Sequence, residues 1–369
     1  MPDISLTHLK KSYGVIHAVD DLSLKIKDGE YIAFLGPTGA GKTTTMYLIT
    51  GIVYPDSGEI IINGKNITQI PPEDRGISFV FEQFALFPHL NLIENCTYSR
   101  WVRGQMNTPT GRDKALEIAN EILEMIFLTG RNTARVNELS GGMKQRLALA
   151  RGLCMGAQII VMDEPLGALD AKIRAELRYE LRRLVKSLKL TCIHATHDTN
   201  EAMITADRIA VFHKGKVVQI DPPSIIYNHP CNLFVANFVA ESNLLEGIIV
   251  NQAANYSEVQ LRENFIIKTQ KINLAVEEKV VVVIRSESFE LKTEQTENIF
   301  PVTLKKIKFI GDFLRCIASL FNSHELLIRL MPSEAKSISI DQKISLFVNK
   351  EECLVFPYPK EGLEEAIAP

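Results

Sequence analysis

The sequence predicts an α/β fold with a doubly wound sheet, followed by a second region rich in β-strands. Three observations support this expectation. Residues 36–43 read GPTGAGKT and fit the phosphate-loop pattern G-x-x-x-x-G-K-[ST]. Residues 159–218 alternate strand and helix patterns, as a sheet covered by helices requires. After residue 231 the long helical patterns end, and short β-like runs indicate a small barrel or sandwich.

The glycine-rich segment needs a strand before it and a helix after it. Residues 31–35 (YIAFL) are an apolar run suited to a buried strand, and residues 43–50 supply about two helical turns before Gly51. In such a loop the backbone N–H groups surround a polyphosphate, Lys42 reaches its β- and γ-phosphates, and Thr43 binds Mg²⁺. The predicted ATP-binding residues of this segment are Gly36, Pro37, Thr38, Gly39, Ala40, Gly41, Lys42, Thr43 and Thr44.

The other elements follow from periodicity and turn residues. Residues 1–30 favour short strands, and residues 58–68 favour a hairpin with an Asn-Gly turn. Residues 84–155 become helical, and residues 113–127 place their apolar side chains on one helix face. From residue 159 the predicted order is strand, helix, strand, loop and strand.

Two adjacent acids end a predicted strand. Residues 159–162 form an apolar run that leads directly to Asp163 and Glu164. Such acids are rarely structural, because an unpaired buried carboxylate is costly. An Asp at this place can hold the shell of a Mg²⁺ ion, and a Glu can polarise the attacking water. Since ligand chemistry gathers at the carboxyl ends of strands, we expect Gly36, Asp163 and the segment before His197 to lie together.

A second string, LSGGMKQR at residues 139–146, follows about 100 residues after the loop. Ser140, Gly141 and Gly142 stand directly before a strong helix former, so a hydroxyl and bare backbone amides lie at the positive end of a helix. This arrangement suits an anion. On the residues alone, the alternative is that Ser140 only caps the helix.

Taken together, the two strings resemble those of the ATP-binding cassette (ABC) ATPases, whose signature is LSGGQ followed by a basic helix. Met143 stands where Gln is usual. The resemblance implies a RecA-like P-loop NTPase domain with a helical subdomain at about residues 84–158. It also implies that two such domains face head to tail, so that each ATP lies between the phosphate loop of one and Ser140, Gly141 and Gly142 of the other.

Further motifs match the family in the same order, and the resemblance gives each a role. Asp170 ends LGALD and matches the D-loop, which passes between subunits. His197, in HATHD, matches the switch histidine whose ring contacts the γ-phosphate. Tyr13, in KSYG, matches the aromatic side chain that stacks on adenine. By the same resemblance Asp163 holds Mg²⁺, and Glu164 is the catalytic base.

One motif departs from the family. Residues 80–90 (VFEQFALFPHL) resemble the Q-loop, in which a Gln six residues before the Pro senses Mg²⁺ and the water. Counting back from Pro88 gives Glu82, not Gln83. An ionised Glu only accepts hydrogen bonds and adds negative charge beside the metal. Three alternatives stay open: Glu82 is a direct, catalytically important Mg²⁺ ligand, which we favour; a raised pKa keeps Glu82 neutral; or the loop slips by one and Gln83 serves.

Length and composition set outer limits. The 369 residues favour two domains, and the 46% hydrophobic content suffices for two cores. A net charge of −3 argues against a general nucleic-acid surface. The six cysteines include no C-x-x-C pair, which indicates small buried side chains in a reducing compartment. Because there is no N-terminal signal and no apolar run near the ~18 residues of a membrane helix, we expect a cytosolic chain.

The second region is expected at residues 236–369, after a nucleotide-binding domain at residues 1–235. It resembles the C-terminal regulatory domain of the maltose-importer type of ABC ATPase, which is built from oligonucleotide-binding-like (OB-like) barrels. Residues 280–291 stand where that group often has I-R-P-E, with Ser286 in place of the proline. An excess of acid over base and little aromatic surface argue against nucleic-acid binding there.

The resemblance as a whole implies the ATPase subunit of an importer, bound peripherally at the cytoplasmic face of the inner membrane. Its expected cofactors are ATP and Mg²⁺. Its expected partners are a second ABC ATPase subunit, identical or related, two membrane-spanning permease subunits and, indirectly, a solute-binding protein. Residues 71–75 (PPEDR) and 85–90 (ALFPHL) resemble the carbohydrate-importer branch, so the resemblance favours a sugar or polyol as the cargo. Importers of polyamines, metal chelates and anions share these motifs, so the sequence does not name the cargo.

Two alternatives belong to other classes. The first is a soluble ABC ATPase acting in DNA repair or on ribosomes. Repair members carry long coiled coils between the two strings and ribosome-acting members have two cassettes, whereas this sequence has no sustained heptads, one phosphate loop and one signature. The second is a regulatory protein that senses ATP without hydrolysing it. Glu164 and His197 oppose this alternative, while Glu82 mildly favours it.

Overall fold

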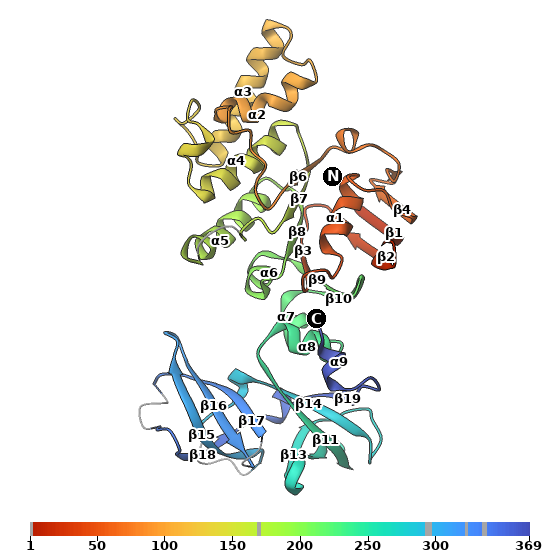
Figure 1. Ribbon diagram of the computed structural model, residues 1–369, viewed down its shortest axis with the longest axis vertical. Helices are drawn as coiled ribbons and strands as arrows, with labels where there is room; N and C mark the ends of the chain where they lie inside the picture. Colours follow the sequence, from red (N-terminus) through yellow and green to blue (C-terminus); the bar gives the residue numbers. More distant parts are fainter. Residues whose placement is uncertain (1–2, 168–170, 292–296, 322–323, 334–337) are drawn as a thin grey trace. The chain divides into compact units, whose positions relative to one another are not determined.

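The chain divides into two compact units. The computed structural model describes residues 3–167, 171–291, 297–321, 324–333 and 338–369 (Figure 1). The first unit comprises Met1–His229 together with Pro369, and the second comprises Pro230–Ala368. The sequence places this boundary near residue 235. Each unit has a hydrophobic core of its own.

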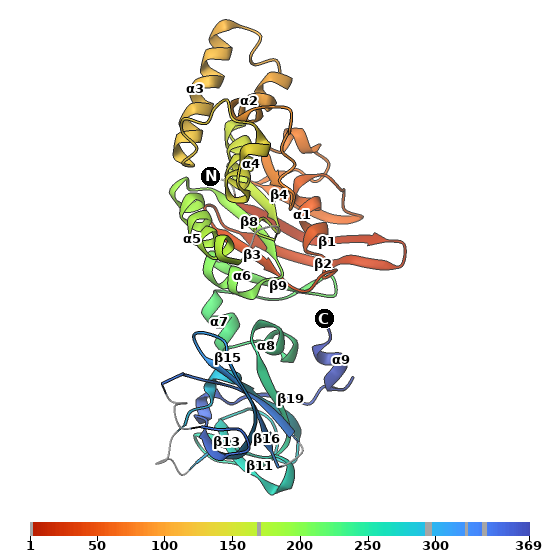
Figure 2. The same cartoon turned by 60° about the vertical axis from the view of Figure 1, so that its left-hand side comes forward.

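A six-stranded sheet with the order β10-β9-β3-β8-β7-β6 forms the centre of the first unit. Its strands are β3 (Tyr31–Leu35), β6 (Ile77–Val80), β7 (Ile159–Asp163), β8 (Thr191–Thr196), β9 (Arg208–His213) and β10 (Lys216–Asp221). All neighbouring strands from β9 to β6 are parallel, and β10 is antiparallel to β9. Helices α5 (Ala171–Ser187) and α6 (Thr199–Thr205) lie on one face and α1 (Lys42–Thr50) on the other (Figures 1 and 2). The predicted doubly wound α/β fold is confirmed.

Helix α6 lies in a stretch that the sequence analysis predicted as a loop, so that part of the prediction is wrong. The side chain of Asp198 caps the helix, because its Oδ1 accepts a hydrogen bond from the Glu201 backbone N–H at 3.0 Å. A helix of 7 residues contains too few apolar positions to reveal a 3.6-residue period. The Asp at the N-cap is the signal that indicates this helix.

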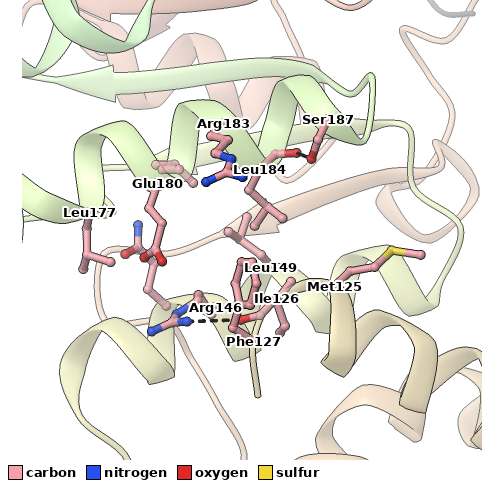
Figure 3. Close-up of a pocket in the computed structure, with 12 residues that line it drawn as sticks. Met125, Ile126, Phe127, Arg146, Leu149, Leu177, Glu180, Arg183, Leu184 and Ser187 are labelled. Atoms are coloured by element: carbon pink, nitrogen blue, oxygen red, sulfur yellow. Dashed lines mark hydrogen bonds between the residues drawn. The ribbon is translucent and has the colours of Figure 1, made fainter. Parts of the chain in front are cut away.

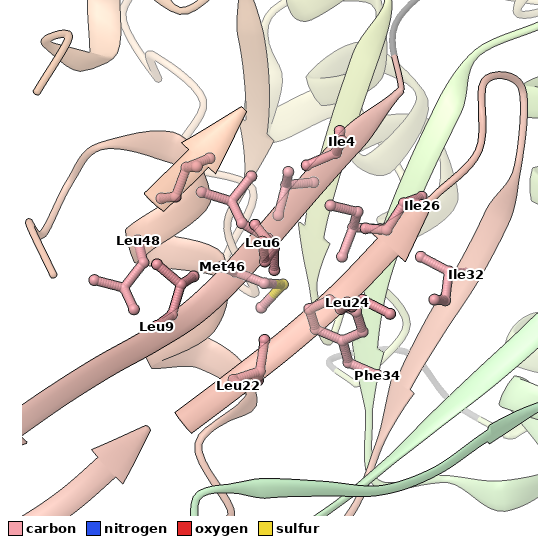
Figure 4. Packing of buried hydrophobic residues seen from close by; sticks show 14 of the residues in the cluster. Ile4, Leu6, Leu9, Leu22, Leu24, Ile26, Ile32, Phe34, Met46 and Leu48 are labelled. Carbon is pink, nitrogen blue, oxygen red and sulfur yellow. The ribbon is translucent and has the colours of Figure 1, made fainter. Parts of the chain in front are cut away.

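A second, antiparallel sheet packs against α1 and β3. Its order is β2-β1-β4-β5, with bounds β1 (Ile4–Tyr13), β2 (Ile16–Ile26), β4 (Ser57–Ile62) and β5 (Lys65–Asn66). Asn63 and Gly64 have φ of 52° and 73°, so the predicted hairpin turn is confirmed. Leu6, Phe34 and Met46 belong to the core between these elements (Figure 4). Burying each such side chain stabilises the fold by roughly 1.5–3 kcal/mol.

Three helices form a separate layer with its own apolar cluster: α2 (Leu92–Val102), α3 (Pro109–Met125) and α4 (Gly141–Cys154). The predicted apolar face of α3 is confirmed by its buried residues Ala115, Ala119, Ile122 and Leu123. Arg151 of α4 donates hydrogen bonds to the carbonyl oxygens of Ala85 and Phe84, at 2.6 and 3.3 Å. These bonds tie α4 to the turn that follows β6. Helix α7 (Pro223–Asn228) ends the first unit.

The second unit is rich in β-strands, as predicted, and begins with a short helix, α8 (Leu233–Val239). One antiparallel sheet has the order β13-β12-β11-β14-β19 and the other β17-β16-β15-β18. Their strands are β11 (Ser242–Gln252), β12 (Tyr256–Gln260), β13 (Ile266–Gln270), β14 (Lys279–Arg285), β15 (Ile299–Phe309), β16 (Leu314–Leu320), β17 (His324–Leu330), β18 (Lys343–Phe347) and β19 (Leu354–Pro357). Phe289 and Phe300 lie in the core that the two sheets share. Helix α9 (Leu363–Ile367) follows.

Most cysteines have the surroundings that the sequence analysis predicted. Five of the six are buried: Cys96, Cys154, Cys192, Cys316 and Cys353. The expectation is wrong for Cys231, which is exposed just before α8.

Candidate active site

Glycines shape the loop between β3 and α1. Gly39 and Gly41 have φ of 82° and 101°, a conformation that L side chains rarely adopt. A Cβ atom at Gly41 would lie 2.3 Å from the carbonyl oxygen of Ala18. A Cβ atom at Gly36 would lie 2.4 Å from the carbonyl oxygen of Phe212. The path of this loop therefore requires glycine at these three positions.

Lys42 begins α1 and folds back over the loop. Its Nζ donates hydrogen bonds to the carbonyl oxygens of Gly36 and Pro37, at 2.7 and 2.9 Å. Burial lowers the pKa of Lys42, and the nearby carboxylates of Glu164 and Asp163 act in the opposite direction. The ammonium group therefore lies between the loop backbone and the two strand-end acids, where a polyphosphate site needs a cation.

Asp163, at the end of β7, faces the first turn of α1. The hydroxyl of Thr43 donates a hydrogen bond to Asp163 Oδ1 at 3.3 Å. Burial raises the pKa of Asp163; the hydrogen bond from Thr43 opposes this shift, while the charges of Glu164 and, more weakly, Glu82 add to it. A hydroxyl and a carboxylate are hard oxygen ligands, so this pair fits a Mg²⁺ ion.

Glu164 and His197 contact each other where β7 and β8 end. One ring nitrogen of His197, Nδ1, lies 2.8 Å from the Glu164 carboxylate. The backbone N–H of Glu164 donates to the carbonyl oxygen of Ala195 at 3.0 Å. The φ of Glu164 is 44°, a conformation that costs about 1–3 kcal/mol for a residue with a side chain. The structure thus places the predicted base and the predicted switch histidine side by side.

A buried polar network that was not predicted from the sequence lies behind His197. Tyr31 Oη lies 2.9 Å from His194 Nδ1, and Thr196 Oγ1 donates to Glu201 Oε2 at 2.7 Å. His194 Nε2 lies 3.1 Å from Glu201 Oε1, but the atoms are not aligned for a hydrogen bond, so this contact is electrostatic. Burial alone would raise the pKa of Glu201. The facing His194 and the hydrogen bond from Thr196 have a larger combined effect, so the pKa of Glu201 is lowered. Polar residues inside otherwise apolar strands were the available signal.

Ser140, Gly141 and Gly142 lie at the start of α4. Ser140 Oγ accepts a hydrogen bond from the Met143 backbone N–H at 3.4 Å, so Ser140 caps the helix. Gly142 is buried, and a Cβ atom there would lie 2.9 Å from Leu177 Cδ1. Capping does not occupy the backbone amides of the two glycines, so the predicted contact with the nucleotide of a second subunit stays a prediction.

The remaining predicted site residues have different surroundings. Tyr13 ends β1 with 48% exposure, and the Lys11 ammonium lies 5.7 Å from its ring centroid, so the ring is available for stacking. Glu82 and Gln83 are exposed in the turn after β6. In the described part of the chain, no three His, Cys, Asp or Glu side chains are grouped to hold a metal ion, so Glu82 does not complete such a group with the strand-end acids. Asp170 lies outside the described residues.

The geometry defines a P-loop ATPase. A glycine-shaped phosphate loop lies beside a hydroxyl–carboxylate pair, and a second carboxylate is held by a histidine. A family model described as ABC transporter matches residues 19–167. No helix in the described ranges is both long and apolar enough to cross a lipid bilayer.

Comparison with curated proteins narrows the class. Three relatives share the name spermidine/putrescine import ATP-binding protein PotA. The protein from Clostridioides difficile is 36% identical over 80% of this chain and 85% of its own length. The Nitrosospira multiformis protein is 34% identical over 93% of this chain and 95% of its own length. The Acetivibrio thermocellus protein is 39% identical over 80% of this chain and 81% of its own length. The chain therefore belongs to the ABC transporter family, as an ATP-binding subunit of importer type that couples ATP hydrolysis to transport.

Solved structures agree with this assignment. The ATP-binding cassette MJ0796, in a dimeric post-hydrolysis state with ADP and phosphate, is 31% identical, with a TM-score of 0.51 over 60% of this chain and 98% of its own. The ADP form of the cassette MJ1267 is 23% identical, with a TM-score of 0.54 over 62% of this chain and 96% of its own, and shows the shared fold. The predicted P-loop NTPase fold is confirmed.

Proposed function

We propose that this chain is the ATPase subunit of a polyamine importer, with spermidine or putrescine as its cargo. The observation that carries this proposal is the agreement of three relatives, 34–39% identical and all named for spermidine and putrescine import. The expected sugar or polyol cargo receives no support from these relatives. That expectation depended only on the resemblance of residues 71–75 and 85–90 to the carbohydrate-importer branch.

The active-site residues divide the work of hydrolysis. The loop at residues 36–44 binds the phosphates of ATP, with Lys42 at the β- and γ-phosphates and Tyr13 against the adenine. Thr43 and Asp163 would hold Mg²⁺, which when bound neutralises phosphate charge. Glu164 accepts the proton of the attacking water, and His197 fixes the Glu164 carboxylate through its 2.8 Å contact.

The proposed assembly is a pair of such subunits beneath two permease subunits. The glycines after Ser140 offer backbone amides at a helix N-terminus, which suits the γ-phosphate bound to the opposite subunit. Binding of ATP closes the pair and hydrolysis reopens it. The chain then lies peripherally at the cytoplasmic face of the membrane, and the permease subunits receive the cargo from a solute-binding protein. The β-rich second unit is the OB-like (TOBE-type) regulatory domain.

The experiment that tests the cargo uses the complete importer in proteoliposomes, with this chain, its permease subunits and its solute-binding protein. ATP hydrolysis is measured with spermidine, with maltose and with no added solute. We expect spermidine to stimulate hydrolysis several-fold and maltose to have no effect. The same importer carrying Glu164→Gln is the control and should show no stimulation. Stimulation by maltose alone, or by neither solute, would contradict a polyamine cargo.

A further inference from the structure

A cavity of about 310 Å³ lies between the end of α3, α4 and α5 (Figure 3). Its apolar walls include Ile126, Phe127, Leu149, Leu177, Leu181 and Leu184. Cavities of this size hold small organic molecules. None of the residues of the phosphate loop lines it, so it is separate from the ATP site described above.

One wall carries a buried amide group without a partner. Gln145 of α4 is only 2% exposed, and its Nε2 has no hydrogen-bond partner among the residues that the structure describes. Leaving such a donor unpaired costs about 1–3 kcal/mol. A molecule in the cavity that offers an oxygen acceptor would remove this cost.

The charges at the rim favour an anion. Arg146 donates through Nη1 to the carbonyl oxygen of Ile126 at 3.2 Å, while its buried Nε has no partner in the described part of the chain (Figure 3). Arg183 and Glu180 of α5 also line the cavity. Two guanidinium groups against one carboxylate leave a net positive charge beside the unpaired amide.

We infer that this cavity is a binding site for a small apolar carboxylate, either aliphatic or aromatic. The hydrocarbon part lies against the leucines of α4 and α5, and the carboxylate accepts hydrogen bonds from Gln145 Nε2 and Arg146 Nε. The inference does not rest on the proposed cargo. Because α4 begins with Gly141 and Gly142, a ligand between α4 and α5 acts on the helix that presents these glycines to a second subunit.

The first test uses the full chain and two probes with the same apolar body and opposite charge. Octanoate and octylammonium are titrated into the protein and binding is followed by calorimetry. We expect one saturable octanoate site per chain and at least tenfold weaker binding of octylammonium, as the donors of the site require. Absence of saturable octanoate binding, or equal binding of the two probes, would overturn the inference.

Variants then locate the site. Leu184→Phe fills the cavity and should abolish octanoate binding. Leu188→Phe is the matched control: Leu188 lies in the turn directly after α5 and outside the lining, so this exchange should leave octanoate binding unchanged. Gln145→Leu removes the amide donor and should weaken octanoate about 3- to 10-fold without affecting octylammonium. Circular dichroism checks that each variant is folded. Equal octanoate affinity in Leu184→Phe and Leu188→Phe would place the bound molecule elsewhere and reject this site.

Discussion

Glu164, the proposed base, has a strained backbone conformation that contacts on both sides hold in place. Its φ of 44° is unusual for a side-chain-bearing residue, and the carbonyl oxygen of Ala195 holds its N–H. Its carboxylate contacts His197, which is more than half exposed and so is accessible to a bound nucleotide. This contact therefore joins the proposed base directly to the proposed sensor of the γ-phosphate.

Glu164→Gln should keep ATP binding and lower turnover by about 10²- to 10⁴-fold, because the amide cannot accept the proton of the attacking water. Phosphate release measures turnover, and a fluorescent ATP analogue measures affinity. Hydrolysis at the parent rate would place the base elsewhere.

Lys42→Ala should abolish tight Mg-ATP binding, because it removes the cation held over the loop by Gly36 and Pro37. Equilibrium titration with a fluorescent ATP analogue measures the loss. Lys65→Ala, which removes an exposed lysine on β5, is the matched control and should bind as the parent does. Unchanged affinity in Lys42→Ala would remove the phosphate loop from the mechanism.

Glu82 distinguishes this chain at the residue scale, and a Mg²⁺ titration of the ATPase activity of the parent, Glu82→Ala and Glu82→Gln proteins decides its role. If the Glu82 carboxylate joins the Mg²⁺ shell, Glu82→Ala should raise the Mg²⁺ requirement and slow hydrolysis, while Glu82→Gln should change the Mg²⁺ requirement only slightly. Coinciding curves for all three proteins would place Glu82 outside the site and leave Gln83 as the candidate.

At the scale of elements, the sequence predicts local structure but not the contacts that form between elements. The strand, loop and helix around residues 31–50 were predictable, because an apolar run, the phosphate-loop glycines and a helix-ending Gly51 follow one another directly in the sequence. The sequence placed Asp163 and the segment before His197 at the same edge of the sheet, because both follow strands, but it did not predict the contact of Glu164 with His197. The contacts of Tyr31 with His194, and of His194 with Glu201, join residues of different elements. A polar residue in an apolar strand signals a buried polar contact, but no local pattern reveals which residue is its partner. The cavity beside Gln145 likewise depends on packing between helices.

Glu201→Gln should lower the free energy of unfolding at pH 7 by about 1–3 kcal/mol, since the ionised carboxylate faces His194. The pKa of Glu201 is lowered from its usual 4.5, so this stabilisation is present above about pH 4.5 and is lost as pH falls through the lowered pKa. Urea unfolding at a series of pH values measures the gap between parent and variant, which should shrink upon acidification. Glu117→Gln, on the exposed side of α3, is the control and should unfold as the parent does. A difference between parent and Glu201→Gln that does not change with pH would contradict a stabilising role of the ionised Glu201 carboxylate.

At the scale of the whole molecule, one chain supplies only part of the proposed ATP site. Ser140, Gly141 and Gly142 begin α4, a helix that belongs to a different layer from the phosphate loop. The relatives of known structure include a dimeric cassette at 31% identity. We therefore expect the complete site to form between two subunits.

Sedimentation of the Glu164→Gln protein with and without Mg-ATP tests this central claim most directly. The variant binds ATP without hydrolysing it, so ATP should convert the monomer to a dimer. Adding Ser140→Arg should prevent the conversion, because the larger side chain fills the space for the γ-phosphate of the opposite subunit. A protein that stays monomeric with saturating ATP, or a dimer that forms equally well with Ser140→Arg, would contradict the account.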